Sequence, residues 1–253
     1  MKLENKQPST SDRVALVTGA ARRIGAEIVR RLHQSGFRVV IHCYQSIAAA
    51  NQLAEVLNAA RPNTALVVQA DLSLDDTSDA VIAAAIEWAG RLDVLVNNAS
   101  LFAESNLVTS DPNFAERLYA LNVFAPWRLS LKARSWLAEG AGNIMNITDI
   151  HAENPLKNYA EYCQSKAALM MQTKALAREF APLVRVNAVA PGAIVWPEQQ
   201  NTVSEAVKNQ IINETPLKMH GKPSFIAEAV LALIANPFIT GQTLRVDGGR
   251  SIG

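Results

Sequence analysis

Short apolar runs alternate with longer amphipathic stretches along most of the chain. The apolar runs are rich in Val, Ile and Leu and predict buried strands at residues 14–17, 38–43, 65–70, 92–96, 142–148, 184–189 and 243–246. Helical spacing of apolar residues predicts helices at residues 22–34, 46–58, 75–88, 113–137, 160–181, 203–212 and 224–235. This alternation predicts right-handed βαβ units, and therefore an α/β fold with one doubly wound parallel sheet of about seven strands covered on both faces.

Turn residues fit between these elements. Gly36 is expected to end the first helix, Ser46 to cap the second, and Arg61-Pro62-Asn63 to turn the chain. A long irregular segment is expected from residue 191 to residue 222, around the short helix at 203–212. No repeat or linker marks a second domain, so residues 13–253 are expected to form one domain and the polar residues 1–12 a loose N-terminal tail.

Composition narrows the class of protein. Of 253 residues, 49% are hydrophobic and 19% charged, which is a globular balance, and the net charge of +1 does not favour nucleic acid or an anionic membrane as a partner. Two cysteines, Cys43 and Cys163, argue against a disulfide scaffold. We find no secretory signal, no apolar run of membrane-spanning length and no metal-ligand spacing of histidines. The expectation is a soluble, cytoplasmic protein without a metal site.

The turn after the first strand is rich in small residues and leads directly into a helix. It reads Thr18-Gly19-Ala20-Ala21-Arg22-Arg23-Ile24-Gly25. In a doubly wound sheet this is where a pyrophosphate binds to free backbone N–H groups at a helix N-terminus. Glycine also serves as ordinary turn punctuation, but the position between a strand and a helix favours a nucleotide.

The end of the second strand indicates which nucleotide. A carboxylate about 20 residues after the glycines holds the ribose hydroxyls of NAD, but Tyr44, Gln45 and Ser46 provide none. Arg22 and Arg23 lie nearby in such a fold and can meet a 2′-phosphate, so NADPH is the favoured cofactor. The alternative is that both arginines are simply solvated, although positive charge at a helix start is electrostatically disfavoured.

A tyrosine and a lysine four residues apart suggest proton transfer. Tyr162 and Lys166 lie on one face of the helix at 160–181, so a phenol stands beside an ammonium group. We expect the cation to lower the pKa of Tyr162 and allow it to pass a proton to or from a substrate. The alternative is that Tyr162 packs in the core and Lys166 is a surface lysine.

Taken together, these motifs resemble the short-chain dehydrogenase/reductase family. The matching pattern is Thr18-Gly19-x5-Gly25, Asp71, Asn97-Asn98-Ala99, Asn122, Tyr162-x3-Lys166 and Pro191-Gly192, over nearly the whole chain. The resemblance implies that Asp71 faces the adenine, Asn98 the nicotinamide ribose, Asn122 a proton-relay water and Lys166 the ribose, with Tyr162 as the acid. It implies a cofactor site made of Gly19, Arg22, Arg23, Ile24, Tyr44, Gln45, Ser46, Asp71, Leu72, Asn98, Ala99, Ser100, Tyr162, Lys166, Pro191 and Gly192. Asp71 capping a turn and Asn122 satisfying buried backbone are the open alternatives.

Three departures from the family pattern concern the substrate. Arg23 and Ser100 stand where glycines are usual, and Asp149 stands where a serine usually precedes the tyrosine by thirteen residues. A serine hydroxyl donates to a ketone oxygen as it becomes an alkoxide, whereas an ionised carboxylate repels that charge. A carboxylate suits a substrate with N–H donors, such as a pterin or folate ring.

These departures resemble the pteridine reductase branch of the family. The resemblance implies that Arg23 contacts cofactor phosphate, that Ser100 lies at cofactor and pterin, and that Phe102 sandwiches the pterin against the nicotinamide; burial of Phe102 in the core is the alternative. Trp196 either closes over the substrate or pins its loop to the body. Tyr159 either adds a hydroxyl to the pocket or packs. The substrate site is then Ser100, Phe102, Asp149, Tyr162 and Trp196, and the catalytic group Asn122, Asp149, Tyr162 and Lys166.

The resulting hypothesis is NADPH-dependent reduction of a dihydropterin or dihydrofolate to the tetrahydro form. The alternatives are a carbonyl reductase of the same family, such as a 3-oxoacyl-carrier-protein reductase, and a non-catalytic NADPH-binding protein. Relatives in the family are usually tetramers, which implies a homotetramer packed through the helices at 113–137 and 160–181.

Overall fold

The computed structural model describes residues 13–105, 112–196 and 204–252. The predicted tail at residues 1–12 lies outside this part of the chain, as does the stretch 197–203 of the predicted irregular segment. Within the described residues, one seven-stranded parallel sheet has the order β3-β2-β1-β4-β5-β6-β7. Its strands are β1 Val14–Val17, β2 Arg38–Cys43, β3 Ala65–Gln69, β4 Val94–Asn97, β5 Asn143–Ile147, β6 Arg185–Pro191 and β7 Thr243–Val246. The sequence predicted all seven.

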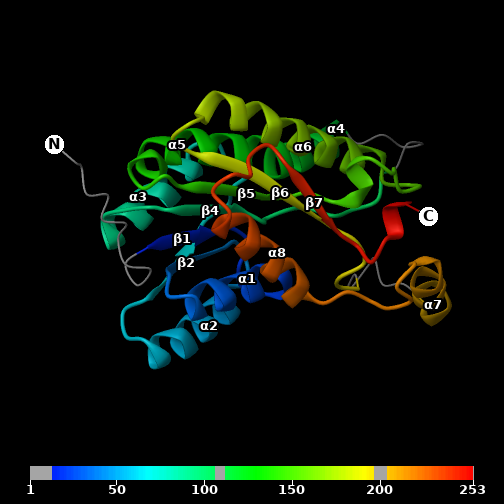
Figure 1. The fold of residues 1–253 in the computed structure, drawn as a ribbon, viewed down its shortest axis with the longest axis horizontal. Coiled ribbons are helices and arrows are strands. Elements are labelled where there is room, and N and C mark those ends of the chain that lie inside the picture. The colour runs from blue at the N-terminus through cyan, green and yellow to red at the C-terminus, as the bar shows by residue number, and fades with distance from the viewer. Residues whose placement is uncertain (1–12, 106–111, 197–203, 253) are drawn as a thin grey trace.

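Helices cover both faces of this sheet (Figure 1). One face carries α1 Arg23–Gln34, α2 Ile47–Ala60 and α8 Pro223–Ala235, and the other carries α3 Thr77–Ala89, α5 Ala125–Glu139 and α6 Ala160–Phe180. Alternating side chains of β1 point to opposite faces of the sheet. Ala15 and Val17 pack on the face of α1, α2 and α8, and Val14 and Leu16 pack on the face of α3, α5 and α6. That alternation is the period-two geometry of a strand buried on both sides. The doubly wound α/β fold is therefore confirmed.

The strand order reverses at β1, and this places the site. From β1 the chain moves outward through β2 and β3, then returns to form β4 on the other side of β1. In open α/β sheets, ligands bind at the carboxyl ends of the strands where the order reverses. The turn after β1 and the residues after β4 and β5 are thus brought to one edge of the sheet.

The helix predicted at 113–137 contains a wider turn. It runs as α4 Pro112–Tyr119, a π-helical turn Ala120–Phe124, and then α5. Wider π turns occur frequently at functional sites, and this one carries Asn122. The short helix expected near 203–212 is α7 Glu205–Glu214, capped by the Ser204 hydroxyl. Among the described helices, none combines the length and the apolarity needed to cross a membrane.

Candidate active site

Two glycines let the turn after β1 pack tightly against the residues after β4. Gly19 has a φ of +60°, and a Cβ there would lie 2.8 Å from the Cα of Ala99. A Cβ on Gly25 would lie 2.5 Å from the Gly19 carbonyl oxygen and 2.6 Å from Nδ2 of Asn98. Both positions therefore require glycine for a steric reason. As in every α-helix, the first N–H groups of α1 have no acceptor within the helix, and the close approach brings this turn into the form of a phosphate-binding turn.

Thr18 and Asn98 fasten this turn to β4. The Thr18 hydroxyl accepts from the backbone N–H groups of Asn98 at 2.9 Å and Ala99 at 3.0 Å. In return, Nδ2 of Asn98 donates to the carbonyl oxygens of Thr18 at 2.8 Å and Gly19 at 3.0 Å. The family resemblance assigned Asn98 to the nicotinamide ribose, and the structure shows its amide holding the turn that precedes α1.

Arg22 and Ser46 come together at the start of α1. Arg22 occupies the N-cap position without a side-chain cap, and the first turn of α1 contains no acidic residue. An Nη of Arg22 donates to the Ser46 hydroxyl at 2.7 Å. Ser46 was predicted to cap α2, but its side chain makes no cap hydrogen bond there. Instead, the two residues place a guanidinium and a hydroxyl beside the end of β2, where a 2′-phosphate group is expected.

Arg23 reaches the segment after β6, and the residues after β2 are exposed. Arg23 has a positive φ of 55°, and an Nη of its guanidinium donates to the Trp196 carbonyl at 3.4 Å. Tyr44 is about half exposed, and Gln45 is exposed. The side chains predicted to surround the adenosine end of the cofactor therefore lie on an accessible edge.

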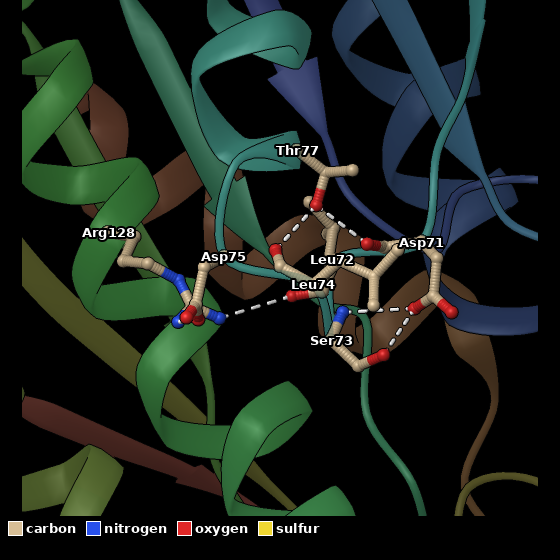
Figure 2. Close-up of polar contacts among 7 residues, drawn as sticks. All are labelled: Asp71, Leu72, Ser73, Leu74, Asp75, Thr77 and Arg128. Carbon is tan, nitrogen blue, oxygen red and sulfur yellow. Dashed lines mark hydrogen bonds and ion pairs between the residues drawn. The ribbon is translucent and has the colours of Figure 1, made fainter.

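Asp71 stabilises the turn between β3 and α3 (Figure 2). Its Oδ1 accepts from the Ser73 backbone N–H at 3.0 Å and from the Ser73 hydroxyl at 2.7 Å, while Leu72 is buried. Arg128 of α5 pairs with Asp75 and donates to the Leu72 carbonyl at 3.5 Å. The turn-capping alternative for Asp71 is thus what the structure shows. The Thr77 hydroxyl at the start of α3 donates to the Asp71 carbonyl at 2.6 Å, so residues of both α3 and α5 hold this turn at the predicted adenine edge.

Asp149 and Tyr162 are joined directly. Asp149 follows β5 and caps the short 3₁₀ turn Ile150–Ala152, where its Oδ1 accepts from the His151 N–H at 2.8 Å. Its Oδ2 accepts from the Tyr162 hydroxyl at 2.7 Å. Asp149 is only partly buried, whereas Tyr162 is 4% exposed. The hydroxyl proton of Tyr162 therefore points at the carboxylate of Asp149.

Burial and Asp149 together control how Tyr162 and Lys166 ionise. Burial raises the pKa of Tyr162 well above its ordinary value, and the charge and hydrogen bond of Asp149 raise it further. Burial lowers the pKa of Lys166 to about 8, against an opposing effect of Asp149. The sequence-based expectation that Lys166 lowers the pKa of Tyr162 was therefore wrong, because loss of hydration and the nearby carboxylate dominate. Tyr162 keeps its proton at neutral pH.

Lys166 lies beneath this pair. Its Nζ is 3.0 Å from the Ile147 carbonyl oxygen, to which it donates, and 5.7 Å from the centroid of the Tyr162 ring. Lys166 is 3% exposed, so the alternative of a solvated surface lysine is wrong. With its pKa near 8, it is mostly cationic at neutral pH and can also lose a proton at modest cost.

Asn122 fixes the backbone that leads to Phe102. Its Oδ1 accepts from the Leu101 N–H at 2.8 Å, and its Nδ2 donates to the Leu101 carbonyl at 3.0 Å and to the Ser165 hydroxyl at 3.0 Å. These bonds join the π-helical turn, the segment after β4 and α6. The alternative in which Asn122 satisfies buried backbone groups is thus the arrangement seen, and it fixes the backbone between Ser100 and Phe102.

The aromatic rings of Phe102, Tyr159 and Tyr162 pack against one another. The Phe102 ring stacks on Tyr159 with centroids 4.5 Å apart and meets Tyr162 edge-on at 4.8 Å. The Tyr159 hydroxyl donates to Glu104 at 3.3 Å, so Tyr159 both packs and makes a polar contact. Phe102 is partly buried. Glu104 was missed by sequence reasoning, and its only signal was its position two residues after Phe102.

Trp196 and Gly192 hold the segment after β6. The Trp196 ring stacks on His220 with centroids 4.2 Å apart, and Lys208 of α7 lies 5.9 Å from the ring centroid. Gly192, after Pro191, donates its N–H to the Val246 carbonyl at 3.1 Å. His220 and Lys208 belong to the same segment 191–222, so the Trp196 ring packs within that segment, while the Trp196 carbonyl accepts from Arg23. A nearby cavity of about 520 Å³ is lined mainly by residues after β6 and around β7, including Thr215 and Asp247, and contains none of the predicted catalytic side chains.

The model of a protein family described as enoyl-(acyl carrier protein) reductase matches residues 19–251. The chain belongs to the short-chain dehydrogenase/reductase family. Within that family, the chain is 38% identical to a granaticin polyketide synthase putative ketoacyl reductase from Streptomyces violaceoruber, over 93% of this chain and 95% of the relative. It is 34% identical to pteridine reductase 1 of Leishmania tarentolae, over 94% of this chain and 96% of the relative.

A solved structure of this reductase family is also similar. It is the FolM alternative dihydrofolate reductase 1 of Brucella canis complexed with NADP, with a TM-score of 0.89, 33% identity and 96% coverage of both chains. The family resemblance and the doubly wound fold are therefore confirmed. The relatives include both a ketoacyl reductase and a pteridine reductase, so they do not select the pterin branch over the carbonyl-reducing alternative.

Proposed function

We propose that this protein is an NADPH-dependent reductase that converts a dihydropterin or dihydrofolate to its tetrahydro form. The observation that carries this proposal is the Asp149 carboxylate held 2.7 Å from the Tyr162 hydroxyl. A carboxylate in contact with the proton donor is poorly suited to an alkoxide that develops beside it. It is well suited to a flat heterocycle that offers ring N–H and amino donors.

The residues around the first turn fit NADPH. The glycines at 19 and 25 leave space that a Cβ would fill, which lets a pyrophosphate approach the N-terminus of α1. Arg22 and Ser46 offer a cation and a hydroxyl for a 2′-phosphate. The family member from Brucella canis complexed with NADP supports the same cofactor. When bound, NADPH supplies a hydride to a carbon of the substrate C=N bond.

Tyr162 supplies the proton in this proposal. After hydride transfer the substrate nitrogen carries negative charge and is a stronger base than the Tyr162 phenolate, so it takes the proton of the hydroxyl that otherwise donates to Asp149. The new N–H bond forms as the Tyr162 O–H bond breaks, and Lys166 stabilises the resulting phenolate from beneath the ring. Asp149 orients the substrate by accepting hydrogen bonds from the N–H groups of the substrate ring, and Phe102 provides a surface on which that ring stacks.

The second candidate is a 3-oxoacyl thioester reductase. It is favoured by the 38% identity to the Streptomyces ketoacyl reductase, which exceeds the 34% identity to the Leishmania pteridine reductase. In this alternative the Tyr162 hydroxyl protonates a ketone oxygen, and Asp149 opposes the charge that develops there. The two candidates share the cofactor and differ in what Asp149 does.

The experiment is a screen of NADPH oxidation with dihydrobiopterin, dihydrofolate, biopterin and an acetoacetyl thioester, run on the wild type and on Asp149→Ser. We expect dihydropterin reduction in the wild type and a loss of about 10- to 100-fold in kcat/KM on removing Asp149, in line with a lost charged hydrogen bond. Asp79→Ser, which breaks only a surface pair with Lys132, is the control. An unchanged dihydropterin rate in Asp149→Ser, or turnover of the thioester alone, contradicts the pterin assignment.

We also propose that copies of the chain associate through the outer faces of α5 and α6. Phe124, Trp127, Leu131 and Met171 are large apolar side chains exposed by 41–63% on and beside these helices. A surface of this kind is more typical of an interface than of a free face. Light scattering of the purified protein tests this, with a homotetramer as the expected result and a monomer as the contradicting one.

A further inference from the structure

His42 lies near the end of β2, buried to 2% exposure, and contacts the turn after β1 twice. Its backbone carbonyl accepts from the Ala20 N–H at 2.8 Å. Its ring Nδ1 lies 3.2 Å from the Gly19 nitrogen, and its Nε2 lies 3.1 Å from the Ala70 carbonyl oxygen. One side chain therefore spans from the glycine turn to the end of β3, directly before Asp71.

These two contacts require one tautomer of the ring. The Gly19 N–H can only donate, so Nδ1 of His42 must accept; the Ala70 carbonyl can only accept, so Nε2 must carry the hydrogen. Burial lowers the pKa of His42 to about 4, although the Ala70 bond and the charge of Asp71 oppose this. The ring is therefore neutral at physiological pH and carries both hydrogen bonds at once.

We propose that His42 is a positioning residue of the cofactor site, which sets the glycine turn and the predicted adenine edge at the correct separation for NADPH. This inference rests on the proposed binding of NADPH. His42 acts through Gly19 and Ala70 and has no role in the chemical step. Since it holds the N–H groups of residues 19 and 20 toward β2, it directs the pyrophosphate to the amides at the start of α1.

A purely apolar side chain at position 42 would not hold the glycine turn and the end of β3 together. Leucine occupies much of the volume of the ring but leaves one buried donor and one buried acceptor unpaired. Both orphaned groups belong to segments expected to contact the cofactor, the turn after β1 and the end of β3. The loss is therefore expected in cofactor affinity as well as in folding stability.

Three substitutions separate the two contacts. His42→Asn keeps an acceptor at the position of Nδ1 but is too short to reach Ala70, His42→Gln can reach Ala70 but has no acceptor at the Nδ1 position, and His42→Leu keeps neither. We expect the dissociation constant for NADPH, measured by nicotinamide fluorescence, to rise about tenfold in His42→Leu. His42→Asn should recover most of that loss through Gly19, and kcat at saturating NADPH should stay near the wild-type value.

The control is the unfolding of each variant without cofactor. If His42 is only structural, the variants lose stability but the folded protein binds NADPH like the wild type, or Asn and Leu weaken binding equally; either result overturns the proposal. If the wild type itself does not bind NADPH, the proposed function fails, and the inference about His42 fails with it.

A measurement on the unmodified protein remains decisive if His42→Leu does not fold. Long-range nitrogen–proton correlation spectra of nitrogen-15-labelled wild type report the tautomer of the His42 ring. We expect the Nε2–H tautomer near neutral pH, with no protonation of Nδ1. Finding the Nδ1–H tautomer, or a ring that titrates near its ordinary pKa, overturns the proposal.

Discussion

The Tyr162 hydroxyl donates a 2.7 Å hydrogen bond to Oδ2 of Asp149, thirteen residues earlier in the chain. The other carboxylate oxygen of Asp149 accepts from the His151 N–H and is thereby fixed in place. Tyr162 itself projects from the first turn of α6 and is buried. The proton donor of the proposed reaction thus points at a carboxylate held by its own turn, and a substrate must share that carboxylate.

The first prediction concerns the ionisation of Tyr162 in Asp149→Asn. The Asp149 charge is one of the causes of the raised pKa of Tyr162, so a neutral amide should lower that pKa, although burial keeps it raised. An acid catalyst is lost as pH rises through its pKa, so activity of the variant should fall at a lower pH than in the wild type.

Phenolate absorbance during alkaline titration measures this pKa directly. Subtracting the titration of the matching protein that also carries Tyr162→Phe isolates the signal of Tyr162. An equal or higher titration point for Tyr162 in Asp149→Asn would mean that the carboxylate does not govern the donor.

The second prediction concerns stability and Lys166. The native pKa of Lys166 is about 8, against an ordinary value of 10.5. Between these values the unfolded chain binds more protons than the native state, so this group's contribution to stability rises with pH. From about pH 7 to about pH 9.5 the gain amounts to about 2 kcal/mol. Lys166→Met removes the titrating group and should abolish it.

Urea unfolding at the two pH values provides the measurement. The difference in unfolding free energy, wild type minus Lys166→Met, should become more positive at the higher pH. Lys174→Met, on the exposed side of the same helix, serves as the matched control and should follow the wild type. If the curves of wild type and Lys166→Met run parallel, Lys166 does not titrate in this range in the native protein.

The third prediction concerns cofactor choice and Arg22. The Arg22 guanidinium reaches the Ser46 hydroxyl at 2.7 Å, in the corner expected to hold the 2′-phosphate. Removing a charged hydrogen bond costs about 1.5–3 kcal/mol, so Arg22→Ala should raise the KM for NADPH about 10- to 100-fold. The KM for NADH should change little, because NADH lacks that phosphate.

Steady-state kinetics with both cofactors measure the selectivity. Arg30→Ala removes an exposed arginine of the same helix that pairs with Glu27 at 3.7 Å, and it should leave both KM values unchanged. Equal losses with NADPH and NADH in Arg22→Ala would show that Arg22 supports the turn and does not discriminate the phosphate.

The fold was predictable because its signals are local and strong. The apolar runs at 38–43 and 65–70 coincide with β2 and β3 to within one residue, since a strand buried on both faces must be apolar throughout. The π-helical turn at Ala120–Phe124 was missed. The turn itself contains no glycine or proline, so periodicity alone does not reveal it. The sequence signal was Pro126, two residues after the turn, because a proline inside a helical pattern removes a hydrogen bond.

The sequence predicted that Tyr162 and Lys166 lie together, but not how they ionise. The four-residue spacing placed Tyr162 beside Lys166. The direction in which the pKa of Tyr162 shifts depends instead on burial by Leu118 and its neighbours, which come from other elements. His42 shows the same limit. Its partners Gly19 and Ala70 lie 23 and 28 residues away, and no local pattern distinguishes such a histidine from an ordinary residue of a strand.

The last prediction decides between a stacking role and a core role for Phe102. Its ring stacks on Tyr159 at 4.5 Å and meets Tyr162 at 4.8 Å, and in the proposed reaction it also stacks against the pterin. Phe102→Leu keeps apolar bulk but removes the aromatic ring, and an aromatic pair contributes about 0.5–1.5 kcal/mol. We therefore expect the KM for dihydropterin to rise about 3- to 10-fold, with the KM for NADPH nearly unchanged.

Two comparison variants make this result interpretable. Tyr159→Phe keeps the stacked ring and loses only the bond to Glu104, so it should change the KM for dihydropterin far less than Phe102→Leu. Phe238→Leu alters a phenylalanine that is 99% exposed and should change neither kinetics nor stability. If Phe102→Leu lowers thermal stability but leaves the KM for dihydropterin unchanged, Phe102 is a core residue and the substrate is held without it.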